Sequence, residues 1–210
     1  MLGFWLLFFL YPLNGTHHYV FSVIPMAAQM GAIAASALLG VDVVIVVSNL
    51  FLSMRGAGVL PRDIGLRFVA TGTFFYLVVS VQGASQAQMA INQAVHFTDW
   101  VVGHSHMAML GFASFAATGG IVHAWQRIPW AHYNPAAITW AYWLMVTGIV
   151  VMFVDLTIAG LVDPRMINGV SVWVKPVKFL ISTGLYLWTL GWFFGYLAPG
   201  ASLGRRIAAT

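Results

Sequence analysis

Long apolar runs separated by short polar loops dominate this sequence and restrict the folds open to it. Six such runs cover approximately residues 2–18, 25–53, 65–90, 100–125, 135–161 and 171–197. All but the first exceed the ~20 residues that an α-helix needs to cross ~30 Å of hydrocarbon. We therefore predict an all-α, polytopic transmembrane bundle of about six helices, whose short first helix begins partway through a span or lies against other helices.

The charge content supports a membrane location. Only 7% of the residues are charged and 60% are hydrophobic, whereas roughly a quarter of an ordinary soluble domain is charged. Nine basic and five acidic side chains cannot coat a chain of 210 residues, so membrane lipid must face most of its surface. The basic residues are scattered among short loops and form no patch, which argues against nucleic acid as a partner.

The sequence contains no cysteine. Disulfides, thiolate metal sites and a C-x-x-C-H haem attachment within this chain are therefore excluded. Any metal must be bound by histidine, aspartate or neutral oxygen ligands. The apolar N-terminal run lacks a basic region and a small-residue cleavage site, so we expect a membrane helix there rather than a signal peptide.

Arginine and lysine placement predicts the topology. The loops at 54–67 and 126–134 carry arginines, whereas those at 14–24 and 91–99 carry none. By the positive-inside rule, both termini are expected on the cytoplasmic side of a bacterial inner membrane. Lys175 and Lys178, spaced i and i+3 at the start of the last helix, are expected to reach the lipid headgroups.

Four histidines are predicted to lie at one depth in this topology. His17 and His18 end the first helix at the outer side, and His104 and His106 lie about one turn into the fourth helix, which starts from that side. Histidine within a membrane span is costly and is usually paired or bound to a metal. The sequence therefore predicts a metal or cofactor site near the outer interface.

The spacing of these histidines limits how they bind. Residues i and i+2 of an α-helix point about 200° apart, so His104 and His106 cannot ligate one centre but can each hold a separate planar cofactor. Adjacent His17 and His18 can converge on one metal only where the helix is broken, and Pro12 and the following Asn-Gly pair supply that irregularity. Imidazole suits both haem iron and copper.

Other polar residues have less specific interpretations. We expect His123 and His132 to be hydrogen-bonded packing residues. Asp42 and Asp155 are candidates for a proton path, for buried hydrogen bonding, or for substrate binding in a small polar-substrate transporter.

Two runs of residues resemble a known family. His96-Phe97-Thr98-Asp99-Trp100-Val101-Val102-Gly103-His104-Ser105-His106 and Gly15-Thr16-His17-His18 are similar to the haem-ligand helix and the copper-binding histidine pair of the haem–copper oxidase catalytic subunit I. The similarity is greatest to the cbb-type (C-family) branch and the related nitric oxide reductases. The resemblance implies a fold that corresponds to the second half of a twelve-helix subunit.

The resemblance also implies roles for individual residues. Its cofactors would be two haems, one high-spin and one low-spin, and copper. His104 would bind the high-spin haem iron and His106 the low-spin haem iron, whereas His17 and His18 would be copper ligands. The residues implied near the haem propionates are His96 and Asp99.

Two further positions correspond to catalytic residues of the family. Tyr11 stands six residues before His17, where the cbb-type oxidases have a tyrosine tied to a copper-ligating histidine. Gln82 stands where those oxidases and many nitric oxide reductases have a glutamate. Because glutamine hydrogen-bonds but cannot titrate, proton delivery through this position differs from the family pattern.

The resemblance covers residues 1–163, a partial haem–copper oxidase-like membrane domain. The other axial ligand of the low-spin haem and the third copper ligand are implied to come from a companion membrane subunit. Residues 164–210 would add another transmembrane helix and a cytoplasmic tail of uncertain kinship, which includes the run Trp173-Val174-Lys175-Pro176-Val177-Lys178-Phe179.

The implied function is part of a terminal respiratory reductase that converts O2 to water, with electrons from a cytochrome c or quinol donor. Nitric oxide reduction to N2O is the alternative within the family. A non-catalytic haem-binding or structural membrane subunit is the alternative of another class.

Overall fold

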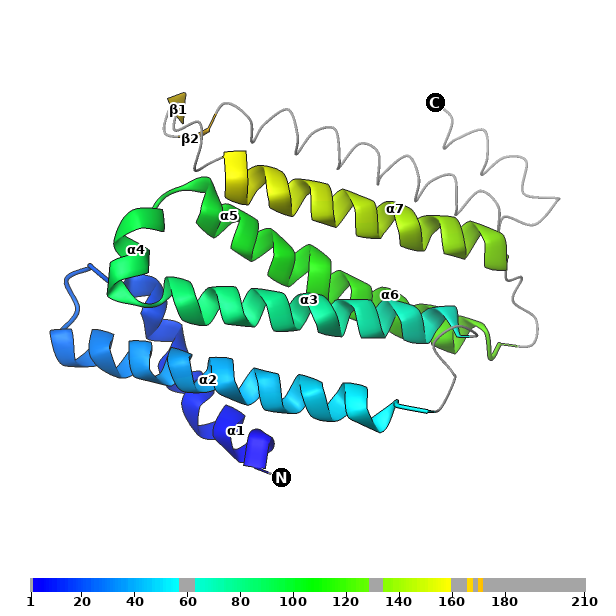
Figure 1. The fold of residues 1–210 in the computed structure, drawn as a ribbon, viewed down its shortest axis with the longest axis horizontal. Helices are drawn as coiled ribbons and strands as arrows, with labels where there is room; N and C mark the ends of the chain where they lie inside the picture. Colours follow the sequence, from blue (N-terminus) through cyan, green and yellow to red (C-terminus); the bar gives the residue numbers. More distant parts are fainter. Residues whose placement is uncertain (1, 57–62, 129–133, 160–165, 168–169, 172–210) are drawn as a thin grey trace.

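The computed structural model describes residues 2–56, 63–128, 134–159, 166–167 and 170–171, and these form a bundle of roughly antiparallel helices (Figure 1). The helices are α1 (Leu2–Asn14), α2 (Met26–Ser53), α3 (Ile64–Gln86), α4 (Met89–Val95), α5 (Asp99–His106), α6 (Ser114–Trp125) and α7 (Pro135–Val154). Irregular helical turns are η1 (Gly15–Tyr19), η2 (Met107–Ala113) and η3 (Asp155–Ala159). Met166–Ile167 (β1) and Val170–Ser171 (β2) pair as a minimal hairpin. The predicted all-α polytopic bundle is confirmed.

Four continuous helices are long and apolar enough to span a membrane: Met26–Ser53, Ile64–Gln86, Asp99–Trp125 and Pro135–Ile158. They match the second to fifth predicted runs. α1 has 13 residues, about 20 Å of helix, and is the short element that the sequence predicts. Apart from Ser171, which ends β2, the sixth predicted run lies outside the described residues, as do Lys175, Lys178 and His132.

Local sequence signals explain where the helices begin. Asp63 caps α3 by accepting a hydrogen bond from the Leu66 amide, and Thr98 caps α5 by accepting one from Trp100. Asn134 accepts from the first two free amides of α7, and proline occupies the first helical position. Pro12 lies inside α1, which ends two residues later and continues as the tight turn η1.

The core lies between α3, α6 and α7. Phe68, Phe75 and Phe115 pack there as a tilted and edge-to-face aromatic cluster, and Met152 of α7 closes it. At the start of α3, the backbone of Gly65 lies against Gly119 of α6. A Cβ at position 119 would lie 2.7 Å from the Gly65 carbonyl oxygen. Such contacts between small residues are typical of helix pairs in membranes.

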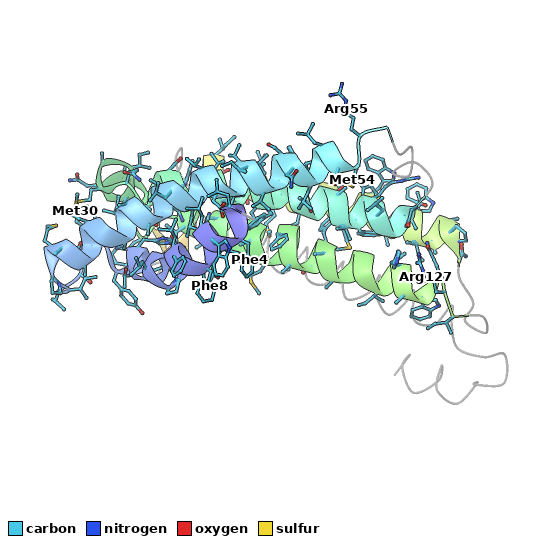
Figure 2. The ribbon with its side chains drawn as sticks, turned by 90° about the horizontal axis from the view of Figure 1, so that it is seen from below. Phe4, Phe8, Met30, Met54, Arg55 and Arg127 are labelled. Atoms are coloured by element: carbon cyan, nitrogen blue, oxygen red, sulfur yellow. The ribbon has the colours of Figure 1, made fainter. Side chains whose placement is uncertain are left out.

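The bundle has two chemically different ends. One end, here called the histidine end, carries η1, α4 and the start of α5; the opposite end, here called the arginine end, carries Arg55 and Arg127 (Figures 1 and 2). The alternation of the helices places these two arginines at one end and Met30 at the other, as the loop pattern predicts.

Candidate metal and haem site

His17 is held by side chains from two helices. Its Nδ1 atom lies 2.9 Å from Asn14 Oδ1 and 2.7 Å from Ser36 Oγ, and the Ser36 hydroxyl lies 2.7 Å from the same Asn14 oxygen. With Asn14 Oδ1 as the acceptor, Nδ1 carries the ring proton and Nε2 keeps its lone pair for a metal. Asn14 and Ser36 therefore orient His17. From the sequence, Asn14 is interpreted only as part of a break in the helix, and no contact with Ser36 is predicted.

The environment of His17 favours the neutral ring. Burial, together with the neighbouring imidazoles of His18 and His104, lowers the pKa of His17 to about 4. A lowered pKa keeps this imidazole neutral at physiological pH, and the neutral form is the one that binds metals. The rings of His17 and His18 lie side by side, with their centroids 4.2 Å apart.

His104 faces α3. Its Nδ1 atom lies 3.3 Å from Gln82 Oε1, and the edge of its ring packs so closely over Gly83 that a Cβ there would lie 2.8 Å from Cε1. Any larger residue at position 83 would displace the ring. The structure thus brings the three histidines at positions 17, 18 and 104 to one end of the bundle, as their predicted depth requires.

His106 is fixed by its own helix. Its Nδ1 atom lies 2.8 Å from the Val102 carbonyl oxygen, which makes Nδ1 the donor and leaves Nε2 with its lone pair. Directly after His106 the helix widens into the π-helical segment η2, an irregularity that often marks functional sites. No feature of the sequence predicts this widening.

The other predicted site residues lie around the same end. Tyr11 on α1 has 66% of its surface exposed. Asp99 opens α5. His96 precedes it and packs between Phe21 and Phe97, at centroid distances of 6.2 and 3.9 Å.

Both phenylalanines beside His96 are strained. Phe21 has a φ of 67° and Phe97 a φ of 61°, values that bulky L-residues rarely adopt. Strain of this kind persists only where surrounding structure enforces it, and it clusters at functional sites. The two loops at the histidine end are thus held in costly conformations.

Several buried polar atoms at this end lack a hydrogen-bond partner in the described part of the chain. They are Gln82 Nε2, Gln86 Oε1, Asn92 Oδ1, Trp100 Nε1 and Asp155 Oδ2. A buried polar atom without a partner costs about 1–3 kcal/mol. Such a cluster fits a site that receives further polar groups from a cofactor or another chain.

No group of three His, Asp or Glu side chains that could hold a metal ion occurs among the described residues. The donor chemistry nevertheless fits imidazole-bound metals, because His17, His104 and His106 each use Nδ1 for a hydrogen bond.

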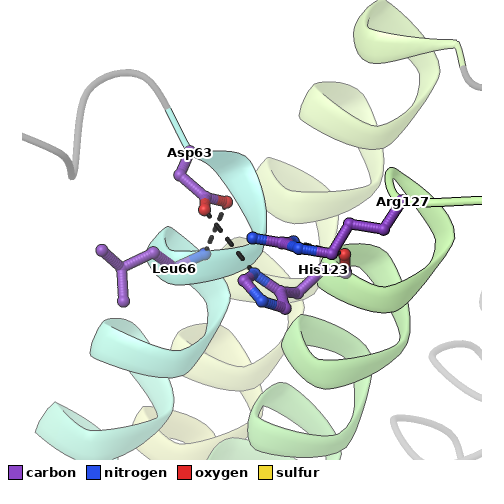
Figure 3. Close-up of polar contacts among 4 residues, drawn as sticks. All are labelled: Asp63, Leu66, His123 and Arg127. Atoms are coloured by element: carbon purple, nitrogen blue, oxygen red, sulfur yellow. Dashed lines mark hydrogen bonds and ion pairs between the residues drawn. The ribbon is translucent and has the colours of Figure 1, made fainter.

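The arginine end is built differently (Figure 3). Asp63 Oδ2 lies 3.7 Å from His123 Nδ1, and the Arg127 guanidinium donates to the His123 carbonyl oxygen at 2.7 Å. The contact between Asp63 and His123 joins the start of α3 to the end of α6. The role predicted for His123, a hydrogen-bonded packing residue, stays a prediction.

Comparison with known proteins supports the resemblance. Residues 1–197 match the family model described as "Cytochrome C and Quinol oxidase polypeptide I". A cytochrome c oxidase subunit 1 homolog of Azorhizobium caulinodans is 28% identical over 169 residues, which make up 78% of this chain and 30% of the relative.

Two further relatives are similar to the same extent. A bacteroid cytochrome c oxidase subunit 1 homolog of Bradyrhizobium diazoefficiens is 27% identical over 79% of this chain and 31% of its own length. The cbb3-type cytochrome c oxidase subunit CcoN1 of Stutzerimonas stutzeri is 25% identical over 80% of this chain and 36% of its own length. The chain thus spans about a third of the curated relatives that it matches.

Proposed function

Because the chain belongs to the cytochrome c and quinol oxidase polypeptide I family, we propose that it forms one part of a haem–copper terminal respiratory reductase that converts O2 to water. Proteins of this family are membrane subunits of multi-subunit oxidase complexes. The observation that carries the proposal is the placement of His17, His18 and His104 at one end of the bundle, where the His17 and His18 rings lie 4.2 Å apart and His104 lies near enough to interact with both electrostatically.

His104 and His106 would hold two haems. Their separate partners, Gln82 on α3 for one and the Val102 carbonyl for the other, support two centres rather than one. His96 and Asp99 would lie near the haem propionates. When bound, haem and copper supply the electron transfer and the reduction of the gas, and the protein supplies ligation and orientation.

Gln82 acts as a positioning residue in this proposal. By accepting a hydrogen bond from Nδ1 of His104, its amide oxygen fixes the tautomer that leaves Nε2 for iron. A glutamate there would add a negative charge and a titratable group. With glutamine, the position orients His104 without binding or releasing a proton.

His17 and His18 would bind copper together with a third histidine from a companion membrane subunit. Tyr11, six residues before His17, would supply an electron and a proton to the reaction. Its large exposed fraction, 66%, supports a neighbouring element packed over this face in the complete complex.

The companion subunit would also supply the second axial ligand of the low-spin haem, and a cytochrome c or quinol site on a partner would deliver electrons. The assembly would lie in the bacterial inner membrane with both termini of this chain in the cytoplasm, because Arg55 and Arg127 share one end.

Gas consumption by the complex, purified with its companion subunit, tests the proposed substrate. We expect O2 uptake with reduced cytochrome c or quinol, abolished in His104→Ala. Consumption of nitric oxide without O2 uptake would contradict the proposal and support nitric oxide reductase, the alternative within the family.

A non-catalytic subunit is the second candidate. The absence of a three-residue metal-binding group within the described residues is the observation in its favour. A purified complex with no Soret band would support this candidate and contradict haem binding by His104 and His106.

A further inference from the structure

Trp100 carries a buried hydrogen-bond donor that the proposed site does not use. Its indole Nε1 atom is shielded from solvent and has no acceptor in the described part of the chain. The backbone amide of Trp100 is satisfied separately, because the Thr98 hydroxyl oxygen accepts from it at 3.3 Å. Asp155 of η3 also has a buried oxygen without a partner there, so the two groups do not satisfy each other. An indole N–H can only donate, and a buried tryptophan normally places it on an acceptor.

The helical register directs Trp100 toward the interior of the bundle. Gly103, three residues later, faces η3, where a Cβ at position 103 would lie 3.1 Å from Thr157 Cγ2. His104, four residues later, faces α3 through Gln82. At about 100° per residue, Trp100 projects between these two directions, about 60° from Gly103 and about 40° from His104. The indole therefore lies on the side of α5 that packs against α3 and η3, which agrees with its buried N–H.

The same register assigns Trp100 to one of the two proposed haem positions. His104 stands about one turn further along the same face, about 6 Å in rise, whereas His106 points about 120° away. Trp100 is closer than His104 to the start of α5, where the proposed function has His96 and Asp99 near the haem propionates. The carboxylates of a haem held by His104 are therefore the nearest incoming acceptors for the indole.

A propionate in this part of the bundle would need neutral donors from the chain. Residues 68–126, which include α4, α5, α6 and nearly all of α3, contain no lysine or arginine. A hydrogen bond from an indole N–H to a carboxylate is charge-assisted, and such bonds are about twice as strong as those between neutral groups. The exclusion of water around Nε1 strengthens the bond further. The unpartnered indole therefore suits a carboxylate acceptor.

We propose that Trp100 is a positioning residue that donates its indole N–H to a propionate of the haem bound by His104. The inference rests on the proposed function, because it requires haem at His104. Trp100 fixes the rotation of the macrocycle about its bond to His104 and stabilises a carboxylate charge inside the bundle. It satisfies its own buried donor by the same contact.

Haem titration with free and with blocked propionates tests the contact. Protohaem and its dimethyl ester, in which both carboxylates are replaced by neutral methyl esters, are each titrated into the haem-free complex of this chain with its companion subunit. Binding is followed at the absorption of the high-spin haem. We expect the ratio of the Kd for the ester to the Kd for protohaem to be about tenfold lower in Trp100→Phe than in wild type, because only wild type loses the charge-assisted bond.

The ratio separates this contact from packing, because a cavity left by Trp100→Phe weakens the binding of both porphyrins alike. Trp140→Phe on α7, where the tryptophan is 66% exposed, is the matched control and should keep the wild-type ratio. Equal ratios in wild type and Trp100→Phe would overturn the proposal. An equal fall of the ratio in both variants would overturn it as well.

Wild-type protein gives a second test, which holds even if Trp100→Phe does not assemble. Ultraviolet resonance Raman spectra report the strength of the hydrogen bond at an indole N–H. We expect the difference spectrum between the protohaem and ester complexes to show one indole whose hydrogen bond weakens in the ester. A difference spectrum without such a change would contradict the contact.

The two proposals fail in different ways. A complex that binds neither porphyrin contradicts haem ligation by His104 and, with it, the role of Trp100. A complex that binds both porphyrins, with equal ratios in wild type and Trp100→Phe, contradicts the role of Trp100 alone. That result would assign the indole to an acceptor on the companion subunit and leave haem binding intact.

Discussion

The two ends of the bundle use polar residues in opposite ways. At the arginine end, Asp63, His123 and Arg127 use one another and nearby backbone atoms, so the contacts are complete within the chain. At the histidine end, the histidines are oriented through Nδ1, while five other buried polar atoms lack partners among the described residues. One end holds the helices together, and the other is arranged to receive further groups.

The largest expected effect is on copper at the histidine end. His17→Ala removes one of the two adjacent imidazoles and leaves the copper site with one ligand from this chain. The copper content of the complex should therefore fall at least tenfold. Metal analysis of the purified complex measures this. His123→Ala, at the arginine end, is the matched control and should retain the wild-type copper content. An equal loss of copper in both variants would contradict the assignment of copper binding to the histidine end.

Removing the support of His104 should have the next largest effect. Gln82→Leu leaves Nδ1 of His104 without its acceptor, and loss of such a supporting partner weakens metal binding by about 10–100-fold. Titration of haem into the complex, followed at the Soret band, measures this affinity. Gln82→Glu keeps the acceptor and should bind haem more tightly than Gln82→Leu. Identical haem affinities for the two variants would contradict the role of Gln82 in positioning His104.

At the arginine end the expected effect is on stability alone. In Gly119→Ala the new methyl group would meet the Gly65 carbonyl oxygen at 2.7 Å and Val69 Cγ2 at 2.6 Å, and such overpacking costs about 1–3 kcal/mol. Thermal unfolding in detergent measures the loss. Gly120→Ala has no heavy atom within 4 Å of the new group and should unfold like wild type. A loss of haem from folded Gly119→Ala protein would contradict the separation of roles.

The smallest expected effect belongs to the partly exposed ion pair. Asp63→Asn keeps the cap on Leu66 but removes the charge opposite His123, so stability should fall by at most about 1 kcal/mol. Repeating the unfolding at high salt should erase the difference. A larger loss that persists in salt would give this pair a role beyond a surface contact.

Much of this architecture could be predicted from the sequence. Apolar run length defined α2, α3 and α7, because hydrocarbon thickness sets helix length. The alternation of spans across the membrane predicts that His17 and His104 lie at the same end of the bundle. The helix and tail predicted for residues 164–210 and the copper ligand expected from a companion subunit stay predictions.

The features that the sequence does not predict are local irregularities of the helices and contacts between distant residues. The π-helical turns η2 and η3 have no local sequence signature, and the Ser36 contact with His17 joins residues 19 positions apart. The closeness of Gly3 to Asp42 likewise depends on how α1 crosses α2. Apolar periodicity predicts which helices form, but these contacts arise only when side chains pack.

The visible spectrum of single-histidine variants tests the central claim most directly. In the complex with its companion subunit, His106→Ala should remove the low-spin haem signal and retain the high-spin signal, and His104→Ala should do the reverse. Loss of both signals in either variant, with protein that remains folded, would contradict two separate centres on one helix. Wild-type spectra in both variants would contradict haem ligation by this chain.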